Sequence, residues 1–126
     1  MESNRVTHQK DLLESVLEVL TILKERRPDL EDNLITTLAN TEVLLRKDNL
    51  SDTDLAWIDE KIIHYVCHPK CLYDFCPLVQ LEGETDQMRW QRWGQIVDQM
   101  LKRAVLLCKR VEKKKRNAPT LKNSLR

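Results

Sequence analysis

The sequence predicts an all-α protein: a four-helix, bundle-like domain with a long basic C-terminal helix and a connector rich in Cys and His before that helix. Three observations favour this class. Only two Gly and four Pro occur in 126 residues, too few turn residues for an all-β chain. Apolar residues recur at intervals of three and four, the spacing of one helix face. The length is that of one domain, which we expect over residues 1–116, followed by a disordered basic tail over residues 117–126.

Two apolar stripes predict the first two helices. The first stripe consists of Leu12, Leu13, Val16, Leu17, Leu20 and Leu23. It places a helix over about residues 7–26, with Thr7 as its N-cap and Pro28 beyond its end. A second stripe places a helix over about residues 29–47, whose acidic first turn suits the positive end of the helix dipole.

A third helix is expected over about residues 52–67. Ser51 and Asp54 have the spacing of a capping box at its start, and Pro69 follows its end. Residues 68–84 form an irregular connector in this prediction, because Pro and Gly interrupt them and no periodicity is present. A structureless loop of this length is uncommon in a compact domain, so we expect something other than secondary structure to order it.

Thr85 is the expected N-cap of a fourth helix over about residues 86–116, roughly 46 Å long at 1.5 Å per residue. The other helices are shorter, so we expect this one to extend past the bundle. Its apolar seam consists of Trp93, Val97, Met100, Ala104, Leu107 and Val111. This spacing is typical of a helix that faces a core.

The charges are sorted along the chain. Residues 1–85 hold 9 Lys and Arg against 17 Asp and Glu, net −8, whereas residues 86–126 hold 12 against 3, net +9. A block this basic repels itself and needs a counter-charge. We therefore expect the basic face of the fourth helix to bind nucleic acid, RNA ahead of DNA because no helix arrangement for the major groove is evident. The candidate phosphate contacts are Arg92, Lys102, Arg103, Lys109, Arg110, Lys113, Lys114, Lys115 and Arg116.

Two other interpretations of the basic end stay open. Its side chains can complement the negative end of the helix dipole and pair with acidic helices of the same chain. They can also belong to a protein–protein adaptor or a viral-type accessory protein, whose basic end docks an acidic partner or serves as a nuclear localisation signal at residues 113–116. A regulatory, non-enzymatic role is expected, since the sequence holds no HExxH, GxSxG or phosphate-binding loop.

A second candidate site lies where the third helix meets the connector. Its members are His64, Cys67, His68, Cys71 and Cys76. Tetrahedral zinc takes four such sulfur or nitrogen ligands, so these residues could hold one structural zinc ion per chain and order the connector. The spacing matches no common zinc-finger framework. In the alternative interpretation, Cys67 and Cys76 pack as small apolar residues and the two His lie at a helix end.

Cellular location and self-association are the last expectations. We find no signal peptide in the first ten residues and no apolar run near the ~18 residues of a membrane span. A cytoplasmic or nuclear protein with reduced thiols is therefore expected. Leu101 and Val105 lie on a flank of the fourth helix that the other helices need not cover. This flank predicts either a homodimer through the fourth helix or a cover formed by Leu72, Phe75 and Leu78 of the connector.

Overall fold

The computed structural model describes residues 2–26 and 32–117, with side chains for residues 5–26 and 33–109. Within these ranges the chain is helical and has no strand, which confirms the all-α class. The elements are α1 (Glu2–Arg26), α2 (Asp32–Leu45), α3 (Asp52–Ile58), the π-helix η1 (Asp59–Val66), the 3₁₀ turn η2 (Leu72–Asp74) and α4 (Asp86–Asn117). Residues 118–126 of the expected disordered tail lie outside the described residues.

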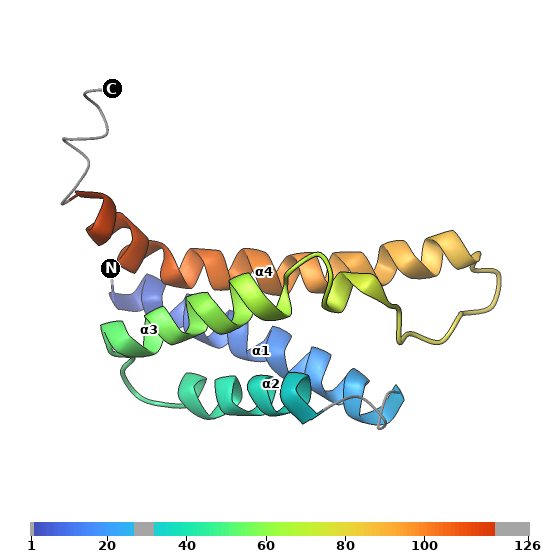
Figure 1. Cartoon of the computed structure of the whole chain (residues 1–126), viewed down its shortest axis with the longest axis horizontal. Helices are drawn as coiled ribbons and strands as arrows, with labels where there is room; N and C mark the ends of the chain where they lie inside the picture. The colour runs from blue at the N-terminus through green and yellow to red at the C-terminus, as the bar shows by residue number, and fades with distance from the viewer. Residues whose placement is uncertain (1, 27–31, 118–126) are drawn as a thin grey trace.

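The bundle is built around α1 and α4: the N-terminal part of α1 lies beside the C-terminal half of α4, and α1 then runs obliquely away from it (Figure 1). α2 packs on α1, while α3 and η1 together form one continuous helix that packs on α4. Their buried faces meet in a single core. Its largest fully buried side chains include Trp93, Leu12, Leu23, Leu38 and Leu55. The seam expected on α4 is buried as predicted from Trp93 to Leu107, and the side chain of Val111 lies outside the described residues.

Helix boundaries differ from the prediction at several points. Thr7 was the wrong N-cap, because α1 begins at Glu2 and Thr7 lies inside it. α2 ends at Leu45 instead of residue 47, and its predicted start at residue 29 lies outside the described residues. The buried side chain of Gln9 on α1 explains this end, because its Nε2 donates to the carbonyl oxygens of Leu45 at 2.9 Å and Lys47 at 2.8 Å. These carbonyls would otherwise lack partners at the helix terminus.

The start of α3 is as predicted. Ser51 Oγ accepts from the Asp54 backbone N–H, and the Asp54 carboxylate accepts from the Ser51 N–H, both at 3.0 Å. These bonds, together with Lys47, lower the pKa of Asp54. The helix then widens into a π-helix up to Val66, closed by a bond from Cys67 N–H to the Ile62 carbonyl at 2.8 Å. Apolar periodicity gave no indication of this change.

Candidate nucleic-acid interface

α4 presents two opposite faces. Trp93 is 1% exposed, and Lys102 lies nine residues further on, which places it on the opposite side of an α-helix. Thr85 caps the helix as predicted, since its Oγ1 accepts from the Met88 N–H at 3.1 Å. α4 extends past the other helices mainly at its N-terminal end, where the connector folds back along it, while its C-terminal turns lie beside the start of α1 (Figure 1). The extension is therefore chiefly at the end opposite to the basic one.

Arg92, a candidate phosphate contact, holds the connector. Its Nε and Nη2 donate to the two carboxylate oxygens of Glu84 at 2.8 and 3.0 Å, and Nη2 also donates to the Val79 carbonyl at 2.8 Å. The hydrogen bond to Glu84 raises the pKa of Arg92. The hydrogen bonds from Arg92 and from the Leu81 N–H lower the pKa of Glu84 to about 2. A phosphate would have to displace a bidentate carboxylate to reach this guanidinium.

Arg89, which is not among the candidate phosphate contacts, holds the same segment one turn earlier. Its Nη1 donates to the carbonyls of Cys76 at 3.3 Å and Leu78 at 3.0 Å, and its Nη2 donates to Asp86 at 2.7 Å. A sequence signal for this role exists. Two arginines three residues apart follow directly after a connector whose backbone carbonyls need donors.

The earlier part of the connector is held by aromatic side chains. Trp93 Nε1 donates to the Leu72 carbonyl at 2.7 Å, and the Phe75 ring lies 6.3 Å from the Trp93 ring, centroid to centroid. Tyr73 donates its hydroxyl to the Asp98 carboxylate, and burial, followed by this contact, raises the Tyr73 pKa. Side chains of α4 therefore order the connector, which has little secondary structure of its own.

Arg103 also turns toward the fold. Its Nη1 donates to the Asp11 carbonyl at 2.9 Å and to Ser15 Oγ at 3.0 Å, and it lies 3.8 Å from a carboxylate oxygen of Glu14. Ser15 is itself 1% exposed. The guanidinium therefore joins α4 to α1.

Lys102 and Lys109 differ from Arg92 and Arg103 in their surroundings. Both side chains are exposed, and neither ammonium group has a hydrogen-bond or ion-pair partner among the side chains described, which end at Lys109. They stand seven residues apart, which puts them on one line about 10 Å long. The remaining candidates, Arg110, Lys113, Lys114, Lys115 and Arg116, continue the same helix, and their side chains lie outside the described residues.

The five metal candidates are not gathered around one point. His64 pairs with Asp59 at 3.5 Å, and His68 Nδ1 accepts from the Lys70 N–H at 3.1 Å. Burial, followed by the nearby Cys71 and Asp98, raises the pKa of the Cys67 thiol to about 12. Cys76 Sγ contacts the Arg89 carbonyl at 3.7 Å. Among the residues that the structure describes, no group of three or more His, Cys, Asp or Glu could hold a metal ion.

The flank expected to drive dimerisation is partly covered. Leu101 packs against the core, whereas Val105 stays 40% exposed beside Leu106 at 39%. The connector does pack on α4, but the contacts above place it at residues 89–98.

A search of the described residues finds no helix of the length and apolarity needed to cross a membrane. Comparisons with protein-family models, curated proteins and solved structures found no match.

Proposed function

We propose that the C-terminal half of α4 binds nucleic acid through its phosphates, RNA ahead of DNA, in a regulatory role without a catalytic step. The observation that supports the proposal is the pair of exposed ammonium groups of Lys102 and Lys109, which lie on one line of α4 and have no ion-pair partner among the residues whose side chains are described, 5–26 and 33–109. Ammonium groups that neutralise phosphates release counterions, and this release supplies most of the sequence-independent affinity.

The hydrogen bonds that Arg92 and Arg103 make within the chain leave fewer candidates for phosphate contacts. Arg92 and Arg103 hold the connector and α1, so their use on a phosphate would cost the fold these bonds. The proposal rests instead on Lys102 and Lys109, together with Arg110, Lys113, Lys114, Lys115 and Arg116 on the same helix. The sorted charge supports this location, because residues 1–85 carry a net −8 and repel a polyanion.

Within this proposal, RNA is preferred to DNA because of the type of contact that exposed lysines on one helix can make. A single exposed line of lysines on a bundle helix provides charge without an arrangement of two helices for the major groove. Structured RNA is recognised largely through shape and phosphate contacts. The preference therefore concerns the type of contact and includes no base sequence.

The experiment is a salt titration of binding to a labelled RNA hairpin and to a DNA duplex of the same length. If six phosphates are neutralised, log K falls with log salt with a slope of about −5 for duplex DNA. Replacing Lys102 and Lys109 with Ala should flatten that slope by about two. A slope near zero, or no binding at low salt, would reject nucleic acid and leave an acidic protein partner as the counter-charge.

A further inference from the structure

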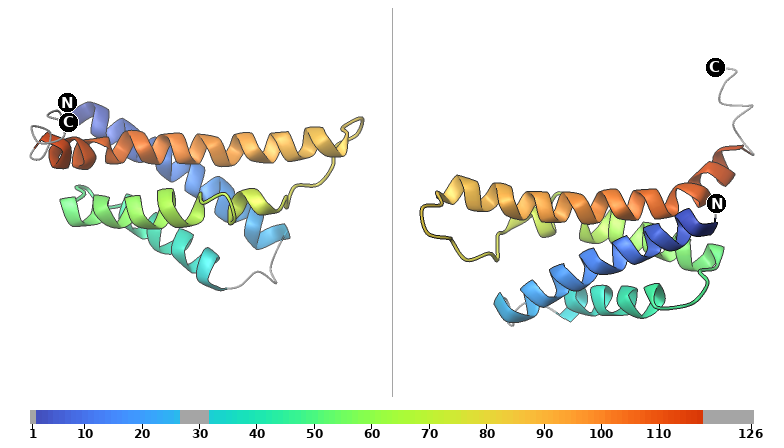
Figure 2. Two further views of the ribbon diagram at one scale, coloured as in Figure 1. Left: turned by 45° about the horizontal axis from the view of Figure 1, so that its top comes forward. Right: turned by 180° about the vertical axis from the view of Figure 1, so that it is seen from behind.

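Two exposed apolar side chains lie between the lysines on which the proposed nucleic-acid interface rests. Lys102, Val105, Leu106 and Lys109 occupy positions i, i+3, i+4 and i+7 of α4, so they share one face of the helix, which we call the outer face. Val105 is 40% exposed and Leu106 is 39% exposed. α4 runs along one side of the bundle, with the other helices together on its opposite side (Figure 2). The outer face is therefore accessible to a partner.

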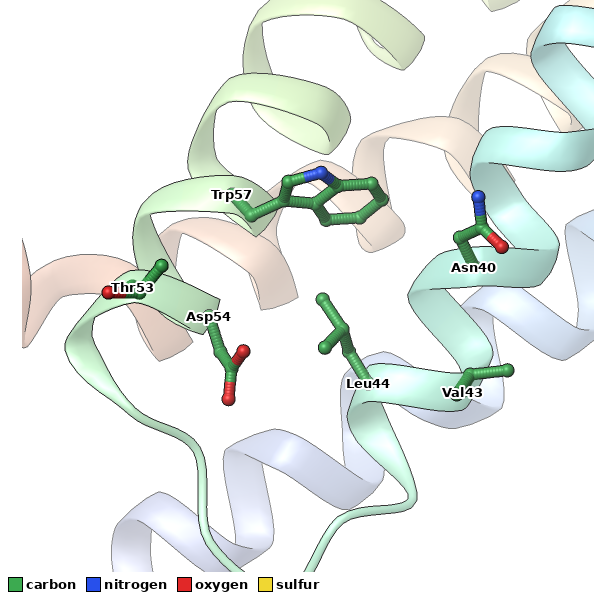
Figure 3. A pocket seen from close by; sticks show the side chains of 6 residues that line it. All are labelled: Asn40, Val43, Leu44, Thr53, Asp54 and Trp57. Carbon is green, nitrogen blue, oxygen red and sulfur yellow. The ribbon is translucent and has the colours of Figure 1, made fainter.

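The combination of apolar and cationic groups distinguishes this face from other exposed apolar positions. A groove between α2 and the continuous helix of α3 and η1 contains a hollow of about 340 Å³, lined by Asn40, Val43, Leu44, Thr53, Asp54 and Trp57 (Figure 3). Val43 is 67% exposed, more than Val105. Its neighbour in the lining is the Asp54 carboxylate, which repels a polyanion. An apolar side chain between two lysines instead suits a polyanion that also has an apolar part.

We propose that the outer face of α4 binds RNA at nucleotides whose bases are unpaired. Lys102 and Lys109 contact phosphates, and Val105 and Leu106 lie against a base between them. This inference rests on the proposed function and specifies its substrate class. The base is the part of a nucleic acid that has an apolar face, and every base has one, so the contact requires no particular sequence.

Pairing and stacking cover the faces of the bases in a duplex. The major groove of A-form RNA is too deep and narrow for side chains, and the minor groove displays hydroxyl groups and base edges. Val105 and Leu106 would thus meet a polar surface on a fully paired stem. At a bulge, loop or strand end a base can leave the stack, and its face can cover the two side chains. Removing this apolar area from water then adds to the attraction between the lysines and the phosphates.

The distance between the lysines leaves room for such a base. Seven residues of α-helix separate Lys102 from Lys109 by about 10 Å along the axis. Phosphates of a stacked strand follow at about 3.4 Å along its axis, so this distance spans roughly three nucleotides, and fewer in an extended strand. On the N-terminal side, Asp98 lies one turn before Lys102, and its carboxylate accepts the Tyr73 hydroxyl. We therefore place the bound strand from Lys102 toward the C-terminal end of α4.

The test compares two RNA duplexes with the same stem, one fully paired and one with a bulge of two unpaired nucleotides at its centre. The affinity of the full chain for each is measured by fluorescence anisotropy at constant salt. The wild type should bind the bulged duplex about fivefold more tightly, as expected for covering two partly exposed apolar side chains. The ratio should change little at higher salt, because salt weakens the phosphate contacts to both RNAs.

Variants assign this preference to the apolar side chains. Val105→Gln with Leu106→Gln removes the apolar surface, keeps the charge and suits a helix. This double variant should bind both RNAs equally, with unchanged affinity for the paired duplex. Val43→Gln is the matched control, because it makes the same change at a more exposed valine in the groove (Figure 3), and it should keep the preference. Lys102→Ala with Lys109→Ala should weaken binding to both RNAs by a similar factor.

The outcomes separate this inference from the function on which it rests. Absence of binding to either RNA at low salt overturns both and leaves an acidic protein as the partner of the outer face. Equal binding of the wild type to the two RNAs overturns this inference alone. So does a preference that the double variant retains, since the bulge is then recognised through its backbone. Circular dichroism and thermal melts establish that each variant is folded; should the double variant unfold, Val105→Thr keeps the branched shape and should also lower the preference.

Discussion

Trp93 and Leu72 are 21 positions apart in the chain, yet the Trp93 indole N–H donates to the Leu72 carbonyl at 2.7 Å inside the core. Both residues are at most 1% exposed. The bond fixes the start of the connector to the buried face of α4, and Arg89 and Arg92 fix its end. The long helix thus uses its N-terminal half to hold the fold and leaves exposed lysines on its C-terminal half.

Trp93→Phe tests the hydrogen bond from the indole N–H to the Leu72 carbonyl. The substitution keeps an aromatic ring but removes the donor, so the buried Leu72 carbonyl loses this partner. We expect a loss of about 1–3 kcal/mol in the free energy of unfolding, with faster amide exchange near η2. Trp90→Phe is the control, because Trp90 is 40% exposed, and it should change stability by less than about 0.5 kcal/mol. Equal losses in urea denaturation would contradict the role given to the indole N–H.

Glu84→Gln tests the ion pair between Glu84 and Arg92, which holds the end of the connector, through the pH dependence of stability. The pKa of Glu84 is lowered to about 2 from its ordinary 4.5, chiefly by the hydrogen bond from Arg92. The unfolded chain therefore takes up this proton first, so the stabilisation is complete above about pH 5 and is lost as pH falls toward 2. The difference in melting temperature between wild type and Glu84→Gln should shrink over this range. For Glu82→Gln, an exposed control, a pH-dependent difference of the same size would argue against the Arg92 pair as the cause.

The cysteines provide a test of burial. Cys67 is 4% exposed, and its pKa is raised to about 12, so little thiolate forms near pH 8. Cys71 and Cys76 are only half-buried. Iodoacetamide should therefore modify Cys71 and Cys76 of the folded protein before Cys67 and Cys108, whereas all four react in denaturant. Peptide mass spectrometry gives the order, and early modification of Cys67 would contradict its placement.

Zinc binding by the connector was an expectation from the sequence, and metal analysis can test it against the contacts that the structure shows. The protein groups that hold this segment are Arg89, Arg92 and Trp93, all on α4. We therefore expect a chelator to leave the melting temperature and the amide exchange of residues 68–84 unchanged. One zinc ion per chain in protein purified without chelator, with a lower melting temperature after its removal, would show that the Cys and His side chains rearrange to bind it.

Much of the fold could be predicted because the residues that set it act locally. The capping box of Ser51 and Asp54, the Thr85 cap and the seam from Trp93 to Leu107 all depend on spacing within one helix. Early Glu and Asn residues do not alter helix periodicity, so the true start of α1 at Glu2 was missed in favour of Thr7. The π-helix of η1 keeps Ile62 and Val66 buried four residues apart, which an α-helix also does.

The candidate site was harder to predict, because the number of charges in a segment does not show which side chains bind partners within the chain. Arg92 and Arg103 look like exposed cations in the sequence, but their partners Glu84, Asp11 and Ser15 come from other segments. Lys102 and Lys109 differ from them only through these long-range contacts. The groove between α2 and α3 could not be foreseen either, because it depends on how far two helices diverge.

The central claim is most directly tested by charge reversal on α4. Lys102→Glu with Lys109→Glu is compared with Lys24→Glu and Lys70→Glu, which changes net charge by the same amount at exposed lysines outside α4. Affinity for an RNA hairpin is measured by fluorescence anisotropy at constant salt, on variants shown to be folded. We predict at least a tenfold loss for the α4 pair and a much smaller change for the control pair. Equal effects of the two pairs, or unchanged binding by the α4 variant, would contradict the assignment of the phosphate contacts to α4.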